Sequence, residues 1–316
     1  MQVINLVEPF NKSILPTGDI VLALGFFDGV HRGHQAVIHR AKTEAKSRNV
    51  RLAVMTLDMH PSIPFKGVNP RDIKYLTILE QKIKLFEKMG ADIVYVVSLN
   101  NLLVKMGPQE FVDKYMVGLN AEAIVAGSDY TYGKKDTANM RLLSKYAEKR
   151  FKVIEVEHLN DKKQKISSTR IRKALLNGDI ACANELLGYH YQNSGKVVHG
   201  EQRGRELGFP TINVAVDTQE MLPAEGIYVV KVALVGKVVL GMASIGRNET
   251  FGAGREVTLE INLLDFSQMV YDQDVVVDWY EKLRGQVKYT GAAGLITQLE
   301  KDEEDTRKYF KKAREI

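Results

Sequence analysis

The first half of the chain alternates short apolar runs with segments of helical spacing. The apolar runs predict strands at 20–26, 51–57, 93–97, 123–126 and 153–156, and the segments between them predict helices after His31, at 78–89, around 108–116 and near 140–149. Strands that alternate with helices are typical of stacked β-α-β units. We therefore predict an α/β Rossmann-like domain with a parallel sheet.

After residue 187 the pattern changes to β-branched strands that recur at short intervals between glycines and charged turns. The predicted strands are 196–199, 226–234, 237–244, 256–264 and 274–279. This spacing predicts an antiparallel β-barrel or sandwich. From 294 to 313 helical spacing returns, with an apolar stripe that includes Leu295, Leu299 and Phe310, so we expect a closing C-terminal helix.

A chain of 316 residues exceeds the usual size of one core, which favours two domains. The change of pattern puts the boundary in the 184–190 region, and we take 1–184 and 185–316 as the two domains. The halves share no internal repeat. Whether the protein associates with itself is left open.

The charge balance gives little indication of a nucleic-acid partner. Lys and Arg exceed Asp and Glu by 44 to 39, a surplus that suits small anions equally well. The short basic run at Lys162, Lys163 and Lys165 lacks interleaved aromatics, so we expect no nucleic-acid groove. A lone cysteine, Cys182, and no apolar stretch of about 18 residues predict a cytoplasmic protein without membrane contact.

A glycine-rich string follows the predicted strand 20–26 and opens a helix: Gly25-Phe26-Phe27-Asp28-Gly29-Val30-His31-Arg32-Gly33-His34. Its glycines let the backbone approach a ligand, and the two imidazoles stand where free amides and the helix dipole already favour anions. The string predicts a phosphate site. The alternatives are an ordinary strand-to-helix turn and a zinc site, for which no cysteine partner lies nearby.

A second string, Ile166-Ser167-Ser168-Thr169-Arg170-Ile171-Arg172, precedes the helical pattern 173–176. Hydroxyls before a helix can simply cap it. Capping needs one hydroxyl, however, and three stand here beside an arginine whose planar fork suits phosphate. We therefore interpret this string as a second phosphate contact.

Together the two strings resemble those of the bacterial bifunctional riboflavin kinase and FMN adenylyltransferase (FAD synthetase) family. The resemblance implies transfer of AMP from ATP to FMN, giving FAD, with magnesium supplying further positive charge. It implies His31, His34 and Arg170 as catalytic residues. The implied ATP contacts are Gly25, Phe27, Asp28, Gly33, Ser167, Ser168 and Thr169.

The residues predicted to bind flavin are indicated by two motifs that match the family less closely. The family's strand-end motif appears as Leu57-Asp58-Met59-His60-Pro61, and its aspartate-aromatic motif as Gly127-Ser128-Asp129-Tyr130-Thr131-Tyr132-Gly133. By resemblance His60, Asp129 and Tyr132 contact flavin, although a plain turn remains the alternative. Leu57 stands where an aromatic residue is usual, which puts stacking on the isoalloxazine in doubt.

The second half carries a glycine-punctuated string that runs from Gly195 to Asn213 and includes Gly-Arg-Glu-Leu-Gly-Phe-Pro-Thr-Ile-Asn. Taken alone, this string predicts either a bulged β-hairpin or a flap that covers nucleotide phosphates. It resembles the family's riboflavin kinase motif, which implies ATP contacts at Gly200, Arg205, Thr211 and Asn213. Thr211 and Asn213 would hold Mg²⁺, and Glu260 would be the general base.

Three positions depart from the kinase motif of the family: Glu249 replaces a proline, Asp272 a glycine and Gln286 a glutamate. Two readings stay open for the barrel, an active riboflavin kinase and a flavin-binding domain without kinase activity. A non-catalytic flavin-responsive protein and a nucleic-acid binder are further alternatives. The expected small-molecule partners are ATP, riboflavin, FMN and FAD.

Overall fold

The computed structural model describes residues 1–200, 204, 207–246 and 257–312. Contacts within the chain divide it into two compact units, Met1–Ser168 and Thr169–Ile316. None of the described helices is long and apolar enough to cross a membrane.

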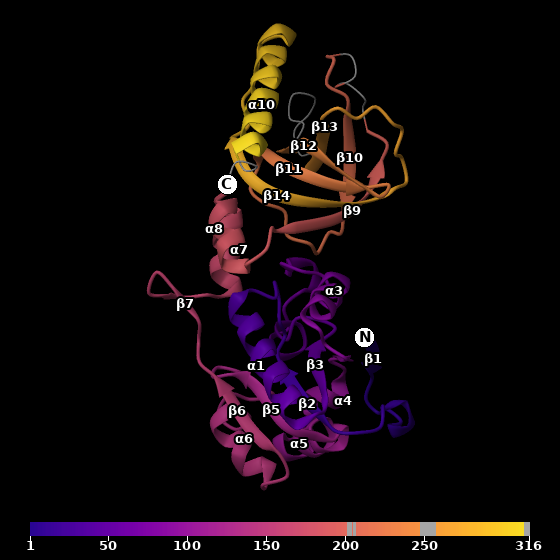
Figure 1. Cartoon of the computed structure of the whole chain (residues 1–316), viewed down its shortest axis with the longest axis vertical. Helices are drawn as coiled ribbons and strands as arrows, with labels where there is room; N and C mark the ends of the chain where they lie inside the picture. Colours follow the sequence, from indigo (N-terminus) through magenta and orange to yellow (C-terminus); the bar gives the residue numbers. More distant parts are fainter. Residues whose placement is uncertain (201–203, 205–206, 247–256, 313–316) are drawn as a thin grey trace. The chain divides into compact units, whose positions relative to one another are not determined.

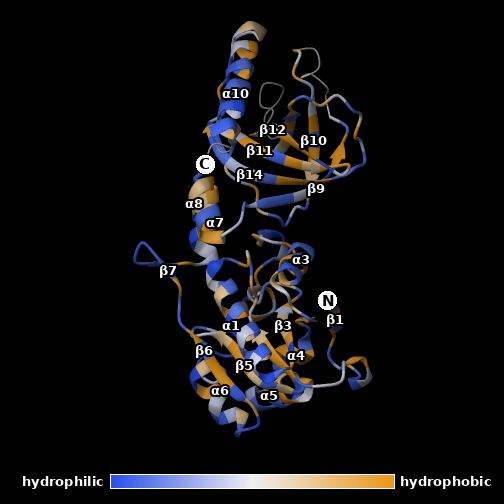
Figure 2. Cartoon of the chain, viewed as in Figure 1, coloured by the Kyte–Doolittle hydropathy of each residue, from blue (hydrophilic) through white to orange (hydrophobic). Residues whose placement is uncertain are grey.

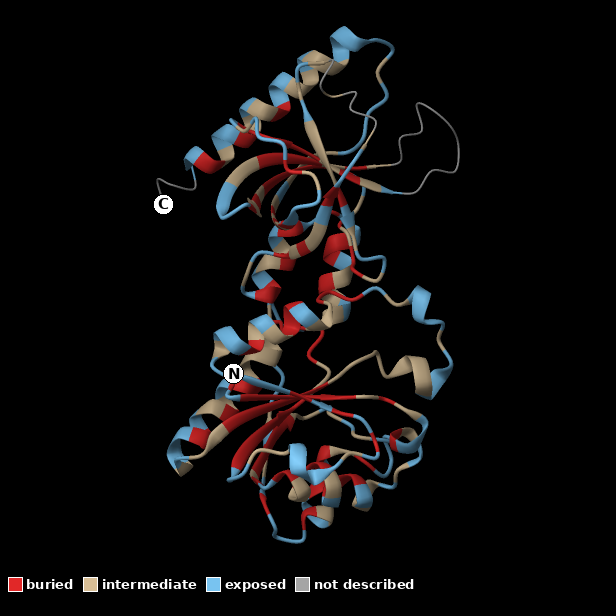
Figure 3. Ribbon diagram, turned by 90° about the vertical axis from the view of Figure 1, so that its right-hand side faces the viewer, coloured by how far each residue is buried: buried red, intermediate tan, exposed pale blue. Residues whose placement is uncertain are grey.

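The first unit is built on a six-stranded parallel sheet with the strand order β1-β4-β3-β2-β5-β6. Its strands are β1 (Gln2–Leu6), β2 (Ile20–Leu24), β3 (Arg51–Leu57), β4 (Ile93–Val97), β5 (Ala121–Gly127) and β6 (Lys152–Val156). Every residue of β2 and β4 is buried, and Figure 3 shows the buried strands crossing this unit. Burial on both faces explains why these strands read as continuous apolar runs.

Helices cover both faces of this sheet (Figure 1). On one face, α1 (Arg32–Arg48) and α3 (Leu79–Met89) pack on alternate residues of β2, such as Val21 and Ala23. On the other face, α4 (Asn101–Lys105), α5 (Pro108–Tyr115) and α6 (Met140–Ala147) pack on Leu22 and Leu24. The short helix α2 is Ser62–Lys66, and a hairpin of β7 (Asn160–Asp161) and β8 (Gln164–Lys165) follows β6.

The strand order reverses at β2, because β3 and β4 lie on one side of it and β5 and β6 on the other. In open α/β sheets, ligands bind beyond the carboxyl ends of the strands at such a switch point. The segment that starts at Gly25 follows β2, and the segment that starts at Ser128 follows β5. Two of the predicted motifs therefore meet at one edge of the sheet.

The second unit is a closed antiparallel barrel with the strand order β10-β13-β12-β11-β14-β9. Its strands are β9 (Gln192–Val198), β10 (Thr211–Val216), β11 (Gly226–Leu234), β12 (Lys237–Gly246), β13 (Thr258–Leu263) and β14 (Asp274–Arg284). The helices are α7 (Ser168–Leu176), whose first residue lies in the first unit, α8 (Ile180–Leu187) and α10 (Ala292–Lys312). In Figure 2 the barrel strands alternate in hydropathy, as expected where only one face is buried.

The predicted fold class is confirmed in both units, with one additional strand in the six-stranded sheet, one in the barrel, and the short β7-β8 hairpin besides. Strand β1 lies at the sheet edge and buries only Ile4 and Leu6, so its sequence carries no continuous apolar run. Strand β10 begins at Thr211, inside the glycine-rich string, and its strand pattern was hidden by that motif. The predicted closing helix is observed as α10.

A buried ion pair joins α10 to the barrel. The guanidinium of Arg284, the last residue of β14, donates to both carboxylate oxygens of Asp302, with its shortest contact, Nη2 to Oδ2, at 2.6 Å. The Asp302 side chain is only 3% exposed, and Gln298 donates a further hydrogen bond to it at 2.8 Å. Losing Asp302 would leave the Arg284 guanidinium, which is 19% exposed, without its ion-pair partner.

We expect Asp302→Ala to lower the free energy of unfolding of the barrel by about 3 kcal/mol, because Arg284 loses its buried partner. Trp279 is the only tryptophan and is fully buried in the barrel, so its fluorescence during denaturant titration reports this unit. The control is Asp265→Ala, which breaks an exposed ion pair between Asp265 and Arg307 of α10. It should leave the midpoint of the unfolding transition unchanged. Equal effects from both variants would contradict the anchoring role.

Candidate active sites

The loop between β2 and α1 holds an unusual backbone conformation. Phe27 and Val30 have φ angles of 54° and 34°, in the left-handed region that side chains rarely adopt. Both side chains are buried, and a Cβ at Gly25 would lie 2.6 Å from the Phe27 ring. Only glycine fits at position 25, because the aromatic ring folds back over it. Burial of the two side chains offsets the backbone strain.

Asp28 fixes this loop from within. Its Oδ1 accepts the backbone amides of Leu76 and Thr77 at 3.0 and 3.2 Å, and the side chain of Thr77 accepts the amide of Gly29 at 2.9 Å. Asp28 is buried. Its carboxylate thus ties the loop to the segment before α3, a structural task that the motif alone did not reveal.

His31 and His34 form a stacked pair at the start of α1. His31 is the N-cap, and its Nδ1 accepts the amide of His34 at 3.3 Å. The ring centroids lie 3.6 Å apart with the planes 18° from parallel. Because Nδ1 of His31 accepts this bond, its proton resides on Nε2. That nitrogen can donate to a ligand oxygen.

Burial keeps both imidazoles uncharged. Burial, with a smaller contribution from the positive charge of Lys165, lowers the pKa of His31 from 6.5 to about 4. Burial also holds the pKa of His34 well below its usual value, and the charges of His31 and Lys82 act in the same direction. Near neutral pH the pair therefore supplies hydrogen-bond donors without positive charge.

The second motif reaches the same loop. The hydroxyl of Ser168 donates to the backbone carbonyl of Asp28 at 2.9 Å, which joins the start of α7 to the loop after β2. A Cβ at Gly33 would lie 3.2 Å from the His31 ring and 3.8 Å from the carbonyl of Ile166, so this string also borders the histidine pair. Ser167 precedes α7, whereas Thr169 and Arg170 follow Ser168 on that helix and belong to the second unit.

The predicted flavin residues lie after β3 and β5. The Nδ1 of His60 is 2.6 Å from the Ser62 hydroxyl, and the His60 ring meets Phe26 edge to face with the centroids 5.1 Å apart. Asp129 forms an ion pair with Lys165 at 2.6 Å. Lys165 thereby connects the segment after β5 with strand β8, which directly precedes the Ile166-Ser167-Ser168 string.

Tyr132 stacks on Phe111 with the ring centroids 5.7 Å apart. Its hydroxyl is buried and has no hydrogen-bond partner in the part of the chain that the structure describes. A buried hydroxyl without a partner is costly, which is consistent with a ligand contact at this position.

Sequence reasoning missed Lys82, a buried lysine in α3 whose ammonium donates to the carbonyl of Phe26 at 3.2 Å. The only signal in the sequence was its position on the apolar stripe of that helix, beside Leu79 and Phe86. A charged residue at such a position is uncommon, because burying the ammonium is costly.

The barrel brings its predicted residues together on its outer face. Glu260 lies directly opposite Asn213 on β10 and opposite Ser244 on β12. Leu259 and Ile261 are buried, so alternation directs Glu260 to the outer face with both cross-strand neighbours. Thr211 shares this face two residues before Asn213.

The glycine-rich string packs closely on this polar row. A Cβ at Gly200 would clash with the Asn213 side-chain amide, and one at Gly204 would clash with the backbone carbonyl of Phe209 and touch the Thr211 hydroxyl at 3.4 Å. The close approach at Gly200 therefore brings this string against one of the two residues predicted to hold Mg²⁺. The predicted contact Arg205 and the departure Glu249 lie outside the described residues.

The two other departures are accommodated in the structure. Asp272 adopts a left-handed conformation, with φ at 62°, which glycine would adopt without strain. The side-chain amide of Gln286 donates to the Ser244 hydroxyl at 3.0 Å and to the Ile245 carbonyl at 2.9 Å. Gln286 therefore attaches to the same polar row as Glu260.

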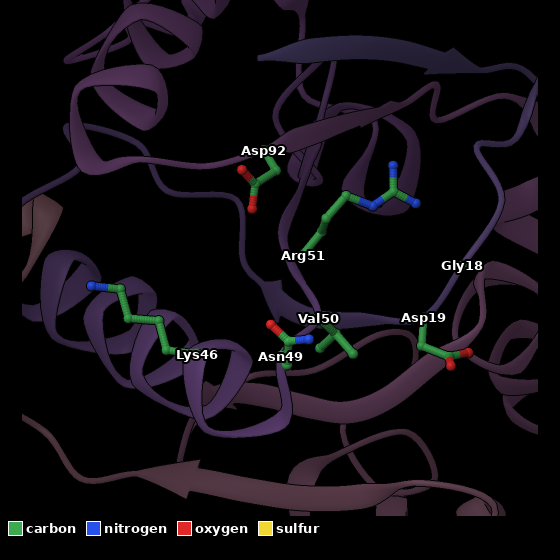
Figure 4. A pocket seen from close by; sticks show the side chains of 7 residues that line it. All are labelled: Gly18, Asp19, Lys46, Asn49, Val50, Arg51 and Asp92. Atoms are coloured by element: carbon green, nitrogen blue, oxygen red, sulfur yellow. The ribbon is translucent and has the colours of Figure 1, made fainter.

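A surface hollow lies at the opposite edge of the sheet (Figure 4). It is lined by Gly18, Asp19, Lys46, Asn49, Val50, Arg51 and Asp92. These residues stand at the amino ends of β2, β3 and β4, away from the motifs. Its lining side chains carry charges of both signs, and the Asp92 carboxylate already accepts a hydrogen bond from the amide of Leu52 at 2.8 Å. We therefore assign no chemistry to this hollow.

Fold and geometry define a class of protein: an α/β nucleotide-binding unit of the nucleotidyltransferase type joined to a small β-barrel. Comparison with known families agrees for each part. Residues 15–170 match the model of FAD synthetase, and residues 187–310 match that of riboflavin kinase.

Relatives named bifunctional riboflavin kinase/FMN adenylyltransferase match almost the whole chain. The protein of Listeria monocytogenes is 45% identical over 99% of both chains, and that of Bacillus subtilis is 39% identical over 99% of this chain and all of its own. That of Escherichia coli K12 is 32% identical over 95% of this chain and 96% of its own. The chain therefore belongs to the bifunctional riboflavin kinase/FMN adenylyltransferase family.

A solved structure from Streptococcus pneumoniae, titled a macrolide-efflux protein, is similar to this chain. It is 34% identical, with a TM-score of 0.88 over 97% of this chain and 99% of its own. The resemblance thus extends over both units.

We expect the His31 ring to titrate at about pH 4, because burial disfavours its charged form. The unfolded chain takes up this proton near pH 6.5, so between these values the unfolded state binds more protons. The stability of the first unit should therefore decrease as the pH falls from about 6.5 to 4. Ring-proton NMR during a pH titration checks this, and a midpoint near 6.5 would contradict the buried, neutral pair.

Proposed function

We propose that the first unit transfers AMP from ATP to the phosphate of FMN, producing FAD. The contact of Ser168 with Asp28 carries this proposal, because it joins the two phosphate motifs at the switch point of the sheet. The family membership reported above supports the same reaction.

In this proposal the ATP phosphates bind to the loop after β2 and to the start of α7. Backbone groups at Gly25, Phe27 and Gly33 would face the nucleotide. The Nε2–H of His31 and the Nδ1 of His34, which has no hydrogen-bond partner among the described residues, would take part as neutral groups. The side chains of Ser167, Ser168, Thr169 and Arg170 would hold the phosphates. Asp28 supports them by keeping the loop in shape.

The transfer needs alignment more than acid-base chemistry. The attacking phosphate of FMN is already ionised near neutral pH, so no side chain has to remove a proton. The protein has to position two anions in line and stabilise charge on the leaving pyrophosphate. Magnesium would neutralise part of that charge.

The flavin would lie against the segments after β3 and β5. His60, Asp129 and Tyr132 are the proposed contacts, and the unpartnered hydroxyl of Tyr132 supports this assignment. Leu57 and Met59 are half-buried aliphatic side chains at the end of β3. They would offer apolar contact to the ring system without aromatic stacking.

For the barrel we propose phosphorylation of riboflavin by ATP. Glu260 would take the proton from the ribityl hydroxyl. Thr211 and Asn213 offer neutral oxygen donors of the kind that Mg²⁺ accepts alongside nucleotide phosphates, and Gly200 and Arg205 would lie beside that nucleotide. A barrel that binds flavin without phosphorylating it is the second candidate, favoured by the strained Asp272.

We further propose that the independently folding domains are 1–184 and 185–316. The two matched families leave residues 171–186 unassigned, and these include most of α7 and α8. A boundary after residue 184 would put α7 and the first part of α8 in the first domain, whereas contacts in the structure group both helices with the barrel, for example the hydrogen bond from the Asn184 side chain to the carbonyl of Trp279 at 2.9 Å.

His31→Ala should lower the rate of FAD formation about 10²- to 10³-fold, the size expected for loss of one donor to a developing charge. Phosphorylation of riboflavin should be unchanged, because Glu260 belongs to the other unit. The two products are followed separately by chromatography, with FMN or riboflavin as the offered flavin. His39→Ala, an exposed histidine of the same helix, is the matched control.

Glu260→Ala should lower riboflavin phosphorylation about 10²- to 10⁴-fold by removing the general base, and should leave FAD formation from FMN intact. Glu281→Ala, an exposed carboxylate on β14, is the control. If wild-type protein forms no FMN from riboflavin, the second candidate for the barrel is correct. If one variant damages both reactions equally, the proposal of two independent sites is wrong.

A further inference from the structure

Lys82 is a buried cation beneath the proposed adenylyl-transfer site. Only 2% of its surface is exposed, and its ammonium donates to the carbonyl of Phe26 at 3.2 Å and to the hydroxyl of Thr56 at 3.3 Å. It also lies 4.2 Å from the centroid of the Phe26 ring. Phe26 follows β2 and Thr56 lies near the end of β3, so one side chain of α3 holds two strand ends.

The negative charges of two carboxylates, those of Asp28 and Asp58, raise the pKa of Lys82 and so favour its charged form. Asp28 accepts two backbone amides through Oδ1, and Asp58 accepts the amide of Leu99 at 3.1 Å. Both carboxylates act on Lys82 through their charge, and its ammonium donates hydrogen bonds to the Phe26 carbonyl and the Thr56 hydroxyl. The ammonium is therefore held by neutral oxygens, an arrangement that is costly for a charge taken out of water.

Lys82 lies between the residues proposed for the two substrates. The Phe26 ring that it contacts meets His60 at 5.1 Å, on the flavin side. The next ring, Phe27, meets His34 at 5.3 Å, and the charge of Lys82 reaches His34 strongly enough to lower the pKa of its ring. The reacting phosphates must meet in this region, where the histidine pair brings no charge.

We propose that Lys82 is a positioning residue for adenylyl transfer, whose buried ammonium fixes the ends of β2 and β3 and offsets repulsion between the nucleotide and FMN phosphates. This inference rests on the proposed function of the first unit. It explains why a cation is retained at a position where leucine or methionine would pack at lower cost.

The pH dependence supports this role. Burial lowers the pKa of Lys82 to about 8, opposed by the charges of Asp28 and Asp58. As the pH rises through 8, the amine loses its charge and the attraction to both substrates weakens. His34, on which the charge of Lys82 acts, does not titrate there, because burial holds its pKa well below the usual value. Burial raises the pKa of Tyr75, whose ring contacts the Phe26 ring.

The test compares Lys82→Met, Lys82→Arg and Lys84→Met in the full chain. Lys84 lies on the same helix but is exposed, so its replacement removes the same charge without touching the site. FAD formation is measured between pH 7 and 10, and riboflavin phosphorylation on the same samples reports intact protein.

We expect Lys82→Met to lower kcat/KM for FMN about 10²-fold and Lys84→Met to change it less than about twofold. The wild-type value should fall above pH 8. That fall should be absent in Lys82→Met, and Lys82→Arg, which stays charged, should keep activity up to pH 10.

Three outcomes would overturn the inference. Lys82→Met could match Lys84→Met, the fall above pH 8 could persist without Lys82, or Lys82→Arg could lose as much activity as Lys82→Met at every pH. The last result would assign Lys82 a purely packing role. Wild-type protein that makes no FAD would instead contradict the proposed function itself.

Discussion

The first site depends on the hydrogen bonds of one buried residue, Asp28. Its carboxylate accepts the amides of Leu76 and Thr77, and its backbone carbonyl accepts the hydroxyl of Ser168. Three segments far apart in the sequence thus meet at one residue: the loop after β2, the segment before α3 and the start of α7. The loop can hold left-handed angles at Phe27 and Val30 because these contacts fix it from both sides.

The sequence predicts the architecture well where hydrophobic residues recur at the spacing of a strand or a helix. Buried parallel strands and the helices between them each leave a signal, whereas the edge strand β1 buries two residues and leaves almost none. The motifs predict which segments bind phosphate, because glycine, histidine and serine serve that task locally. The task of Asp28 and the burial of Lys82 depend on contacts 48 and 56 residues away in the chain, which no local pattern can encode.

The two proposed sites use different physics. The first needs a rigid anion cradle, which a strand-to-helix loop provides through free amides and buried neutral imidazoles. The second needs a carboxylate that takes a proton, and an antiparallel strand presents Glu260 on its outer face while Leu259 and Ile261 fill the barrel.

Gln286 bears directly on the state of the second site. In sequence it reads as the loss of a charge, but its side-chain amide donates two hydrogen bonds, to Ser244 and to the carbonyl of Ile245. An ionised glutamate could donate neither, since it only accepts. Gln286, two residues beyond the end of β14, thus holds Ser244 directly opposite Glu260, and Arg284, the last residue of that strand, is anchored by Asp302. The departure at Gln286 therefore leaves the polar row supported, and the barrel keeps the arrangement on which the proposed kinase activity depends.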